Sequence, residues 1–174
     1  MSDVRIRPTI PADLDALAEV LVEVHANDGY PVEGVDFPRA WIELPEAIGQ
    51  WTGLLDGRPV GHVALIPPGS GDLAPGLLAK HGNVSSNQVA VLVRLFVDPH
   101  ARRRRVAQRL LDAVEDQARR SGLTPVLDVM KKDQAAIRLY EGRGWNRLGA
   151  IEHPHLDGSE PAYAYALRPA TSTE

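Results

Sequence analysis

The sequence contains no cysteine, which excludes disulfide bonds, zinc–thiolate sites and a cysteine nucleophile. Lysine is found only at positions 80, 131 and 132, so arginine supplies nearly all of the positive charge. No apolar stretch approaches the roughly 18 residues that a membrane helix needs, and no basic and hydrophobic segment opens the chain. We therefore expect a soluble, cytoplasmic protein that does not enter a membrane.

The length and charge of the chain indicate how many domains it forms and which partners are unfavourable. Its 174 residues suffice for one domain with a substantial core, which we expect over residues 1–168, followed by a disordered tail over 169–174. The formal net charge of −4 argues against a general nucleic-acid-binding protein, although a local basic patch is compatible with it.

Residues 89–120 combine an apolar run, four consecutive arginines and a long amphipathic segment. Val89–Val97 is predicted to be a buried strand that only Arg94 interrupts, and helical spacing of apolar residues begins at Val106. The first turn of a helix has unpaired N–H groups and a positive dipole end, so the turn at 102–105 is a candidate phosphate site. The alternative is a solvated basic turn beside a surface helix.

The remaining pattern predicts an α/β protein. Apolar spacing indicates a helix over 11–25 with an inward stripe formed by Leu14, Leu17, Ala18, Leu21, Val22 and Val24. A second helix is expected to be capped by Asp133 and to end near Gly142. The other predicted elements are strands at 4–7, 51–55, 60–66, 126–130, 145–151 and 163–167, a short helix at 39–44, a helical turn at 77–80 and a polar loop at 152–161.

Two segments, LFVDPHARRRRVAQRLL at 95–111 and DQAAIRLYEGRGW at 133–145, resemble motifs of the GNAT superfamily of N-acetyltransferases. The likeness covers nearly the whole chain. It implies a mixed, mainly antiparallel sheet with a central splayed parallel strand pair, flanked by helices. It also implies transfer of an acetyl group from acetyl-CoA, as co-substrate, to the amine of a small molecule, peptide or protein. Members of this family often form homodimers.

The family's pyrophosphate-binding turn reads Arg or Gln, two residues, Gly, one residue, then Gly or Ala. Arg102 and Ala107 fill the first and last places, whereas Arg105 and Arg103 stand where glycine is common. The resemblance implies that the cofactor is bound here by Arg102, Arg103, Arg104, Arg105, Val106, Ala107 and Gln108. Arginine at these places either adds charge-assisted contacts to phosphate or blocks the pocket and leaves the fold without the enzyme. The alternative function is a degenerate module that binds CoA or another anion through this turn without catalysis.

The second segment resembles the family's Asn-x-x-Ala-x-x-x-Tyr helix, with Asp133 in place of Asn. The resemblance places Asp133 and Ala136 near the pantetheine arm and Tyr140 beside the sulfur, as the general acid toward the CoA thiolate. It also implies that Leu95, Phe96 and Val97 bind pantetheine and polarise the thioester.

The general base and the acceptor stay open. The amine loses its proton either to water or to a residue such as Glu33, Asp36 or His62, and His153 and His155 are candidates to face the acceptor. The two histidines lack a third ligand at convincing spacing, so no metal site is expected. The aromatic residues of 30–50 either pack in the core or help to hold the substrate.

Overall fold

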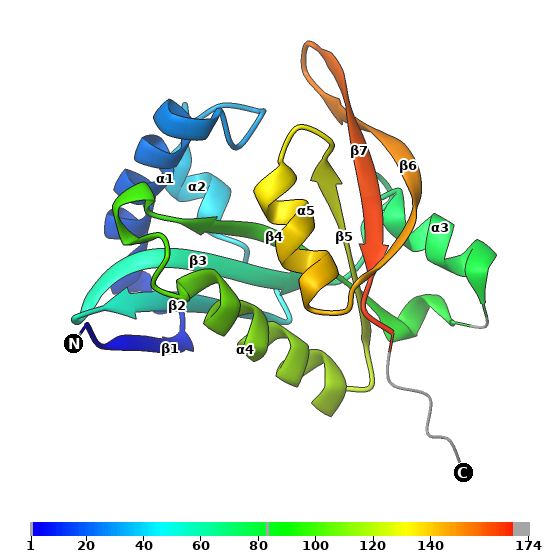
Figure 1. Cartoon of the computed structure of the whole chain (residues 1–174), viewed down its shortest axis with the longest axis horizontal. Helices are drawn as coiled ribbons and strands as arrows, with labels where there is room; N and C mark the ends of the chain where they lie inside the picture. The colour runs from blue at the N-terminus through cyan, green and yellow to red at the C-terminus, as the bar shows by residue number, and fades with distance from the viewer. Residues whose placement is uncertain (1, 83, 169–174) are drawn as a thin grey trace. The chain divides into compact units, whose positions relative to one another are not determined.

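The computed structural model describes residues 2–82 and 84–168, so the predicted tail at 169–174 lies outside the described residues (Figure 1). The described strands are β1 (Val4–Pro8), β2 (Gly49–Leu55), β3 (Arg58–Ile66), β4 (Val89–Val97), β5 (Thr124–Met130), β6 (Asn146–His155) and β7 (Gly158–Ala166). The described helices are α1 (Leu14–Asp28), α2 (Pro38–Ile42), α3 (Ala74–His81), α4 (Val106–Arg120) and α5 (Gln134–Gly142).

The strands form a mixed sheet in the order β1-β2-β3-β4-β5-β7-β6. β4 and β5 are the parallel pair, with Val89 opposite Thr124 and Val91 opposite Val126. The pairs β1–β2, β2–β3, β5–β7 and β6–β7 are antiparallel. The predicted α/β class with a mainly antiparallel sheet and one parallel pair is confirmed, whereas a splay of that pair stays a prediction.

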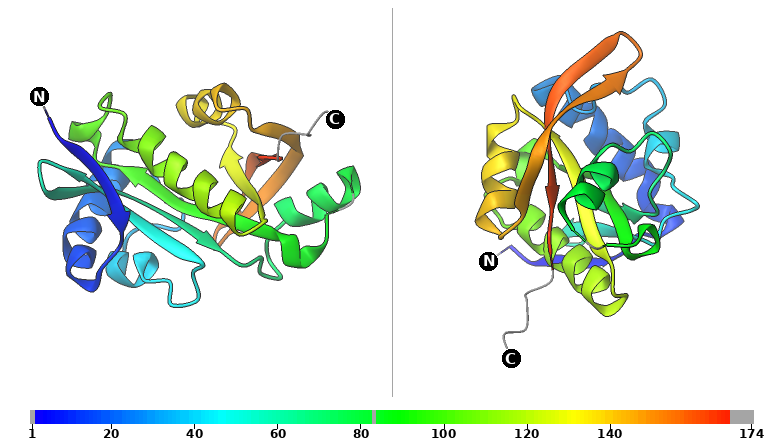
Figure 2. Two further views of the ribbon diagram at one scale, coloured as in Figure 1. Left: turned by 90° about the horizontal axis from the view of Figure 1, so that it is seen from below. Right: turned by 90° about the vertical axis from the view of Figure 1, so that its right-hand side faces the viewer.

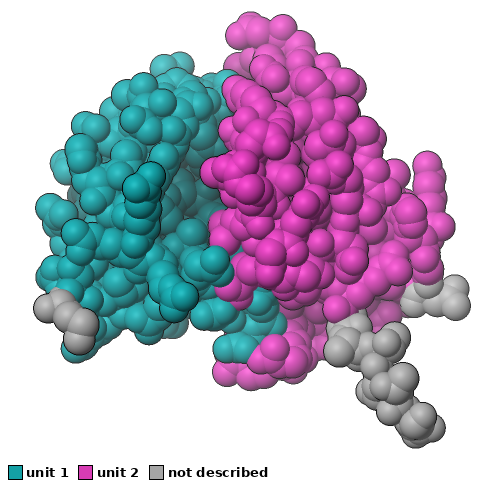
Figure 3. Space-filling model, in the orientation of Figure 1, with its two compact units in different colours: residues 1–66, 92–116 teal, residues 67–91, 117–174 magenta. Residues whose placement is uncertain are grey.

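The chain divides into two compact units, one of residues 1–66 and 92–116 and the other of residues 67–91 and 117–174 (Figure 3). β4 and α4 each contribute residues to both units. The expectation of a single domain stays a prediction.

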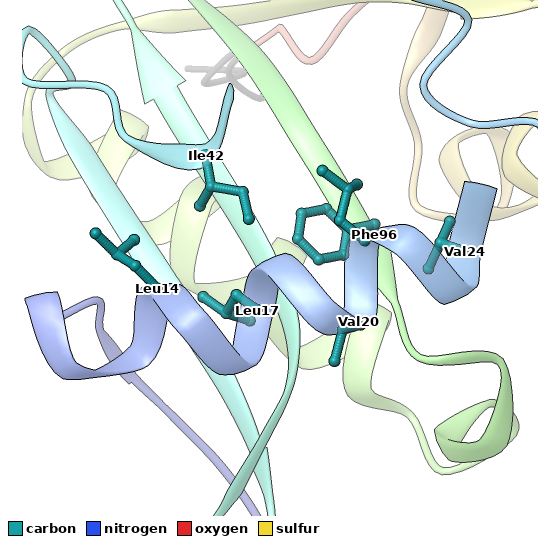
Figure 4. Close-up of a cluster of buried hydrophobic side chains, with 7 residues drawn as sticks. Leu14, Leu17, Val20, Val24, Ile42 and Phe96 are labelled. Atoms are coloured by element: carbon teal, nitrogen blue, oxygen red, sulfur yellow. The ribbon is translucent and has the colours of Figure 1, made fainter. Parts of the chain in front are cut away.

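In the first unit, α1 and α2 cover one face of the strands and the first turns of α4 cover the other (Figures 1 and 2). The inner side of α1 packs with Ile42 of α2 and Phe96 of β4 (Figure 4). The predicted stripe is wrong at Val22, which is 43% exposed, whereas Val20 is buried. Val20 lies three residues after Leu17 and four before Val24, so the helical repeat places it on their side.

Two glycines let α4 approach the sheet closely. A Cβ atom at Gly53 of β2 would lie 2.8 Å from Cγ1 of Val106. One at Gly61 of β3 would lie 3.1 Å both from Val106 Cγ1 and from the carbonyl oxygen of Phe96. Because real Cβ atoms are not found at 2.8 Å from a carbon atom, this contact requires glycine at position 53. The start of α4 is thereby fixed against β2 and β3, beside β4.

In the second unit, α3 and α5 lie on opposite faces of β5, β6 and β7 (Figure 2). The predicted helical turn at 77–80 is too short, because α3 runs from Ala74 to His81 and buries both Ala74 and Leu78. Pro75 and Gly76 weaken the helical signal in the sequence, but proline is well tolerated in a first turn. His81 also joins α3 to β6, with 3.0 Å between its Nε2 and the carbonyl oxygen of Leu148.

The predicted polar loop at 152–161 is wrong, because most of it is strand. β6 continues to His155 and β7 begins at Gly158, so only Leu156 and Asp157 form the turn. The alternation of apolar and polar residues is missing here because the side chains of this hairpin are exposed or half-buried. Pro154 and Pro161 also suggest a break, yet they pair with Ser159 and Glu152.

Candidate active site

The turn between β4 and α4 is built by Asp98. Its side chain accepts a hydrogen bond from the N–H of His100 at 2.9 Å, and its carbonyl oxygen accepts one from Ala101 N–H at 2.9 Å. The four arginines that follow are all exposed. The carbonyl oxygen of Arg105 accepts the N–H of Arg109 at 3.0 Å, so the helical hydrogen bonds begin here. The N–H groups at the start of α4 thus lie next to four arginines, as the sequence predicts.

Arg103 and Arg105 have left-handed backbones, with φ of 63° and 65°. These are the two positions at which the resemblance expects glycine. A residue with a Cβ atom pays about 1–2 kcal/mol to adopt this conformation. The turn therefore keeps a backbone typical of glycine and carries two additional positive charges.

The other two arginines of the turn contact the protein itself. The Arg102 guanidinium binds the Asp28 carboxylate at the end of α1, and it holds the pKa of that carboxyl below its usual value. The Arg104 guanidinium donates to the Ser2 hydroxyl. Among the four, Arg103 and Arg105 are therefore the better placed to offer their side chains to a ligand.

The second half of β4, which holds Leu95, Phe96 and Val97, is fixed to β3 at both ends. Before it, Nδ1 of His62 lies 2.8 Å from the carbonyl oxygen of Arg94. After it, Asp98 N–H donates to the carbonyl oxygen of Val60 at 2.7 Å. Arg94 itself has φ of 60°, a value found where a strand bulges. Phe96 and Val97 are buried, and Leu95 is half-buried.

His62 is fully buried and is held in one tautomer. A carbonyl oxygen only accepts, so the proton must lie on Nδ1, and Nε2 is buried without a hydrogen-bond partner. Burial lowers the pKa of His62 to about 4. His62 is therefore neutral at physiological pH and positions the Arg94 main chain.

In the second unit, Tyr140 of α5 is buried among aromatic rings. Its ring centre lies 5.6 Å from that of Trp145 and 6.4 Å from that of Tyr165. Burial raises the pKa of the Tyr140 phenol, and the charges of Asp128 and Asp133 raise it further. The phenol therefore keeps its proton over the whole neutral range.

Asp133 is the N-cap residue of α5, as predicted, but it forms no capping hydrogen bond through its side chain. Its ψ of 68° differs from the extended backbone that directs a capping side chain toward the first-turn N–H groups. The main chain still starts the helix, since Ile137 N–H donates to the Asp133 carbonyl oxygen at 3.1 Å. Ala136 is half-buried one turn before Tyr140.

A polar network that the sequence does not predict holds the end of α5 to β6 and β7. The Tyr165 hydroxyl donates to Glu141 at 2.7 Å and accepts from Arg147 Nε at 3.0 Å. Arg147 also pairs with Glu141 at 2.9 Å and lies over the Tyr163 ring, 3.8 Å from its centre. Charged residues on exposed strand positions give no sequence signal for such a network. Its effect is to fix the helix that carries Tyr140.

The histidines of β6 differ in their surroundings. Nδ1 of His153 pairs with the carboxylate of Asp128 on β5, whereas His155 lies at the end of the hairpin.

Within residues 2–82 and 84–168, no cluster of three or more His, Cys, Asp or Glu side chains is arranged to hold a metal ion. Over the same residues, no helix is long and apolar enough to span a membrane.

The structure brings the predicted cofactor residues together in two sets. The first unit holds Leu95–Val97 at the end of β4, and Arg102–Gln108 in the following turn and the start of α4. The second unit holds Asp133, Ala136 and Tyr140 on or directly before α5. The first set comes from the segment at 95–111, and the second comes from the segment at 133–145.

Comparison with known proteins identifies relatives. The model of the acetyltransferase (GNAT) family matches residues 15–145. The ribosomal-protein-S18-alanine N-acetyltransferase of Escherichia coli shares 21% identity, with 99% of each chain covered and a TM-score of 0.68. The yncA protein of Salmonella typhimurium, solved with acetyl-CoA, shares 18% identity over 98% of this chain and 96% of its own, with a TM-score of 0.71.

A third similar structure is that of NAA60 from Arabidopsis thaliana in complex with acetyl-CoA. It shares 18% identity over 95% of this chain and 99% of its own, with a TM-score of 0.70. Identities this low show a common fold. A search of curated proteins found no match.

Proposed function

The chain belongs to the acetyltransferase (GNAT) family, and we propose that it transfers the acetyl group of acetyl-CoA to the amine of a small molecule, peptide or protein. Two proteins of similar structure were solved with acetyl-CoA. The observation that carries the proposal is the turn before α4. There, the glycine-like backbone of Arg103 and Arg105 and their exposed charges adjoin the positive end of a helix.

In this proposal the pyrophosphate of acetyl-CoA lies at the start of α4. The N–H groups of Val106, Ala107 and Gln108 bind phosphate oxygens, and the helix dipole stabilises the negative charge. Arg103 and Arg105 add charge-assisted hydrogen bonds. Arg102 and Arg104 contribute positive potential, since their guanidinium groups contact Asp28 and Ser2.

The reaction is a direct transfer. The amine nitrogen attacks the thioester carbonyl carbon, a C–N bond forms, the C–S bond breaks, and the nitrogen loses a proton while the sulfur gains one. Main-chain groups of Leu95, Phe96 and Val97 bind pantetheine and polarise the carbonyl oxygen, which stabilises the negative charge that develops on it. Asp133 and Ala136 contact the pantetheine arm.

Tyr140 protonates the CoA sulfur as the C–S bond breaks. Because its pKa is raised, the phenol is protonated at neutral pH and holds a proton to deliver, although the same shift makes it a weaker acid. The amine loses its own proton to water or to a residue such as Glu33, Asp36 or His62. Of these candidates, His62 is a weak base, because its pKa of about 4 lies well below neutrality.

One titration tests the proposal against its rivals. Calorimetry with acetyl-CoA is followed by addition of an amine panel, while release of the CoA thiol is recorded. We expect saturable binding and amine-dependent thiol release. Saturable binding without release from any amine indicates a module that holds CoA without catalysis, and steeply salt-dependent binding to nucleic acid in place of acetyl-CoA indicates a different function.

A further inference from the structure

Arg94 is a half-buried cation in the middle of an otherwise apolar strand, and its guanidinium carbon lies 4.0 Å from the centre of the Trp41 ring. Its Nε is buried and has no hydrogen-bond partner. In the part of the chain that the structure describes, Arg94 forms no ion pair within 4.0 Å. Burial lowers the pKa of Arg94, and interactions with Tyr30 and Glu33 act in the opposite direction. A buried charged donor of this kind is costly unless a ligand pairs with it.

Trp41 supplies a second donor in the same place. Its indole Nε1 is also buried without a hydrogen-bond partner. The ring packs against Tyr30 and Phe96, with ring centres 5.8 and 6.4 Å apart. The cluster encloses Trp41 Nε1 and Arg94 Nε, whereas Arg94 as a whole is only half-buried. The exposed part of its guanidinium is therefore the group that can meet a ligand that accepts hydrogen bonds and carries negative charge.

The cluster holds Arg94 in place before any ligand arrives. The Arg94 carbonyl oxygen is fixed by His62, whose ring stacks on Phe96 with 5.5 Å between centres. Trp41 covers one face of the guanidinium by a cation–π contact. The planar edge of the guanidinium is the part that can form two parallel hydrogen bonds with a carboxylate.

We propose that Arg94, held against the Trp41 ring, binds a carboxylate of the acceptor, so that the acceptor is an amine that also carries a carboxylate group. This inference rests on the proposed function, because Arg94 directly precedes Leu95–Val97, the segment assigned to the thioester. A carboxylate held at Arg94 orients the attached amine toward the next residues of the same strand. Either a free amino acid or a peptide with an acidic side chain near its N-terminus offers this chemistry.

The test compares amino acids with their α-amides, which lack the carboxylate. We measure kcat/KM for both series with the wild type and with Arg94→Met. Because the reactivity of each amine is the same with either protein, the change in the acid-to-amide ratio reports on Arg94 alone. We expect Arg94→Met to lower kcat/KM for the acids by about 10- to 100-fold and to leave the amides nearly unchanged.

The source of the carboxylate is identified by a second series. Short peptides with Asp at the second position are compared with matched peptides that carry Asn there, again with both proteins. A selective loss for the Asp peptides identifies a peptide acceptor, whereas a loss confined to the free amino acids identifies a small-molecule acceptor.

Three controls accompany these measurements. Arg39→Met makes the same substitution at an exposed arginine of α2 and should leave the acid-to-amide ratio unchanged. Arg94→Lys keeps the positive charge but loses the two parallel N–H donors of the guanidinium, so it should recover only part of the preference for acids over amides. Circular dichroism and acetyl-CoA affinity show whether each variant is folded and binds the cofactor.

An equal loss for acids and amides, or no loss for either, would overturn the inference while the proposed function stands. If the wild type acetylates no amine, the proposed function fails, and calorimetry with the amino acids decides about Arg94. Binding that disappears in Arg94→Met supports a carboxylate site, and binding that is absent or unchanged by the substitution contradicts it.

Discussion

Arginine at positions 103 and 105 combines an unfavourable backbone with a useful charge. The two residues adopt a left-handed backbone conformation, which glycine reaches at a lower cost in free energy. α4 begins with a main-chain hydrogen bond, from Arg109 N–H to the Arg105 carbonyl oxygen, and this bond does not involve the arginine side chains. A residue kept in a strained conformation is often one that serves a ligand. The same reasoning applies to Arg94, whose φ is also positive. Each of these residues can be tested separately.

Arg105→Gly separates the effect of the backbone from that of the charge. We expect the free energy of unfolding to stay the same or to rise by about 1 kcal/mol, because glycine adopts positive φ readily. Acetyl-CoA affinity should fall about tenfold as a charge-assisted contact is lost. Denaturant unfolding and calorimetry measure the two effects.

Arg105→Ala is the matched control, because it removes the charge but keeps a Cβ atom at positive φ. It should weaken acetyl-CoA binding as much as Arg105→Gly and be the less stable of the two variants. Tighter binding by both variants would show that the arginine obstructs the cofactor.

His62 makes stability depend on pH. Its pKa of about 4 in the folded protein lies below the usual 6.5, so the unfolded chain binds a proton first as the pH falls. Stability from this group is therefore complete above about pH 6.5 and is lost as the pH falls toward about 4. Between about pH 7.5 and about pH 4.5 the loss should reach about 2 kcal/mol.

His62→Asn provides the reference for that measurement, since its amide can still donate to the Arg94 carbonyl oxygen but does not titrate. Urea unfolding of both proteins over this pH range gives the difference. Parallel pH curves would show that His62 is not responsible.

Tyr140→Phe tests the general acid. The rings of Trp145 and Tyr165 keep their contacts, so the fold should persist. We expect kcat to fall about 100-fold with little change in the KM for acetyl-CoA, because the hydroxyl acts only as the C–S bond breaks. Unchanged turnover at every pH would exclude the assigned role.

At the scale of elements, Asp13 joins the start of α1 to two strands. Its carboxylate is almost fully buried and accepts from both terminal nitrogens of Arg7, at 2.7 and 2.8 Å. It also accepts from Ile10 N–H and the Thr52 hydroxyl, each at 3.0 Å. Burial alone would raise the pKa of Asp13, but these donors lower it overall.

Asp13→Asn should therefore lower the free energy of unfolding by about 3 kcal/mol, because it leaves Arg7 without its partner. Asp15→Asn, two residues away, breaks only an exposed pair with Arg39 and should cost less than about 1 kcal/mol. Urea unfolding of the two variants compares them. Equal costs would show that the buried pair does not fix α1.

The helices and strands differ in how well the sequence predicts their bounds. β4 and α4 have the predicted bounds because their burial follows the repeat of a strand and of a helix. The β6–β7 hairpin differs from its prediction over residues 152–161, because the side chains there are exposed or half-buried and their pairing needs no apolar alternation. α3 is longer than predicted, since burial of Leu78 outweighs the cost of Gly76 within the helix.

At the scale of the whole molecule, the elements that carry the candidate site were predictable where a motif is local. Arg102–Gln108 and Asp133–Tyr140 are each continuous in sequence, and both sets occur on the expected elements. The Arg94, Trp41 and His62 cluster was not predicted, because its members come from three elements far apart in the chain. The Glu141, Arg147 and Tyr165 network was missed although its members are close in sequence, because exposed charged residues give no signal of the partners that they meet. Contacts between side chains on different elements depend on how the strands and helices are arranged in the fold.

We propose that this chain transfers an acetyl group from acetyl-CoA to an amine. The most direct test is mass spectrometry of an amine panel incubated with acetyl-CoA and the protein, with Tyr140→Phe run in parallel. We expect an N-acetylated product that forms in proportion to the wild-type protein and far more slowly with the variant. Saturable acetyl-CoA binding with no acetylated product from any amine would contradict it.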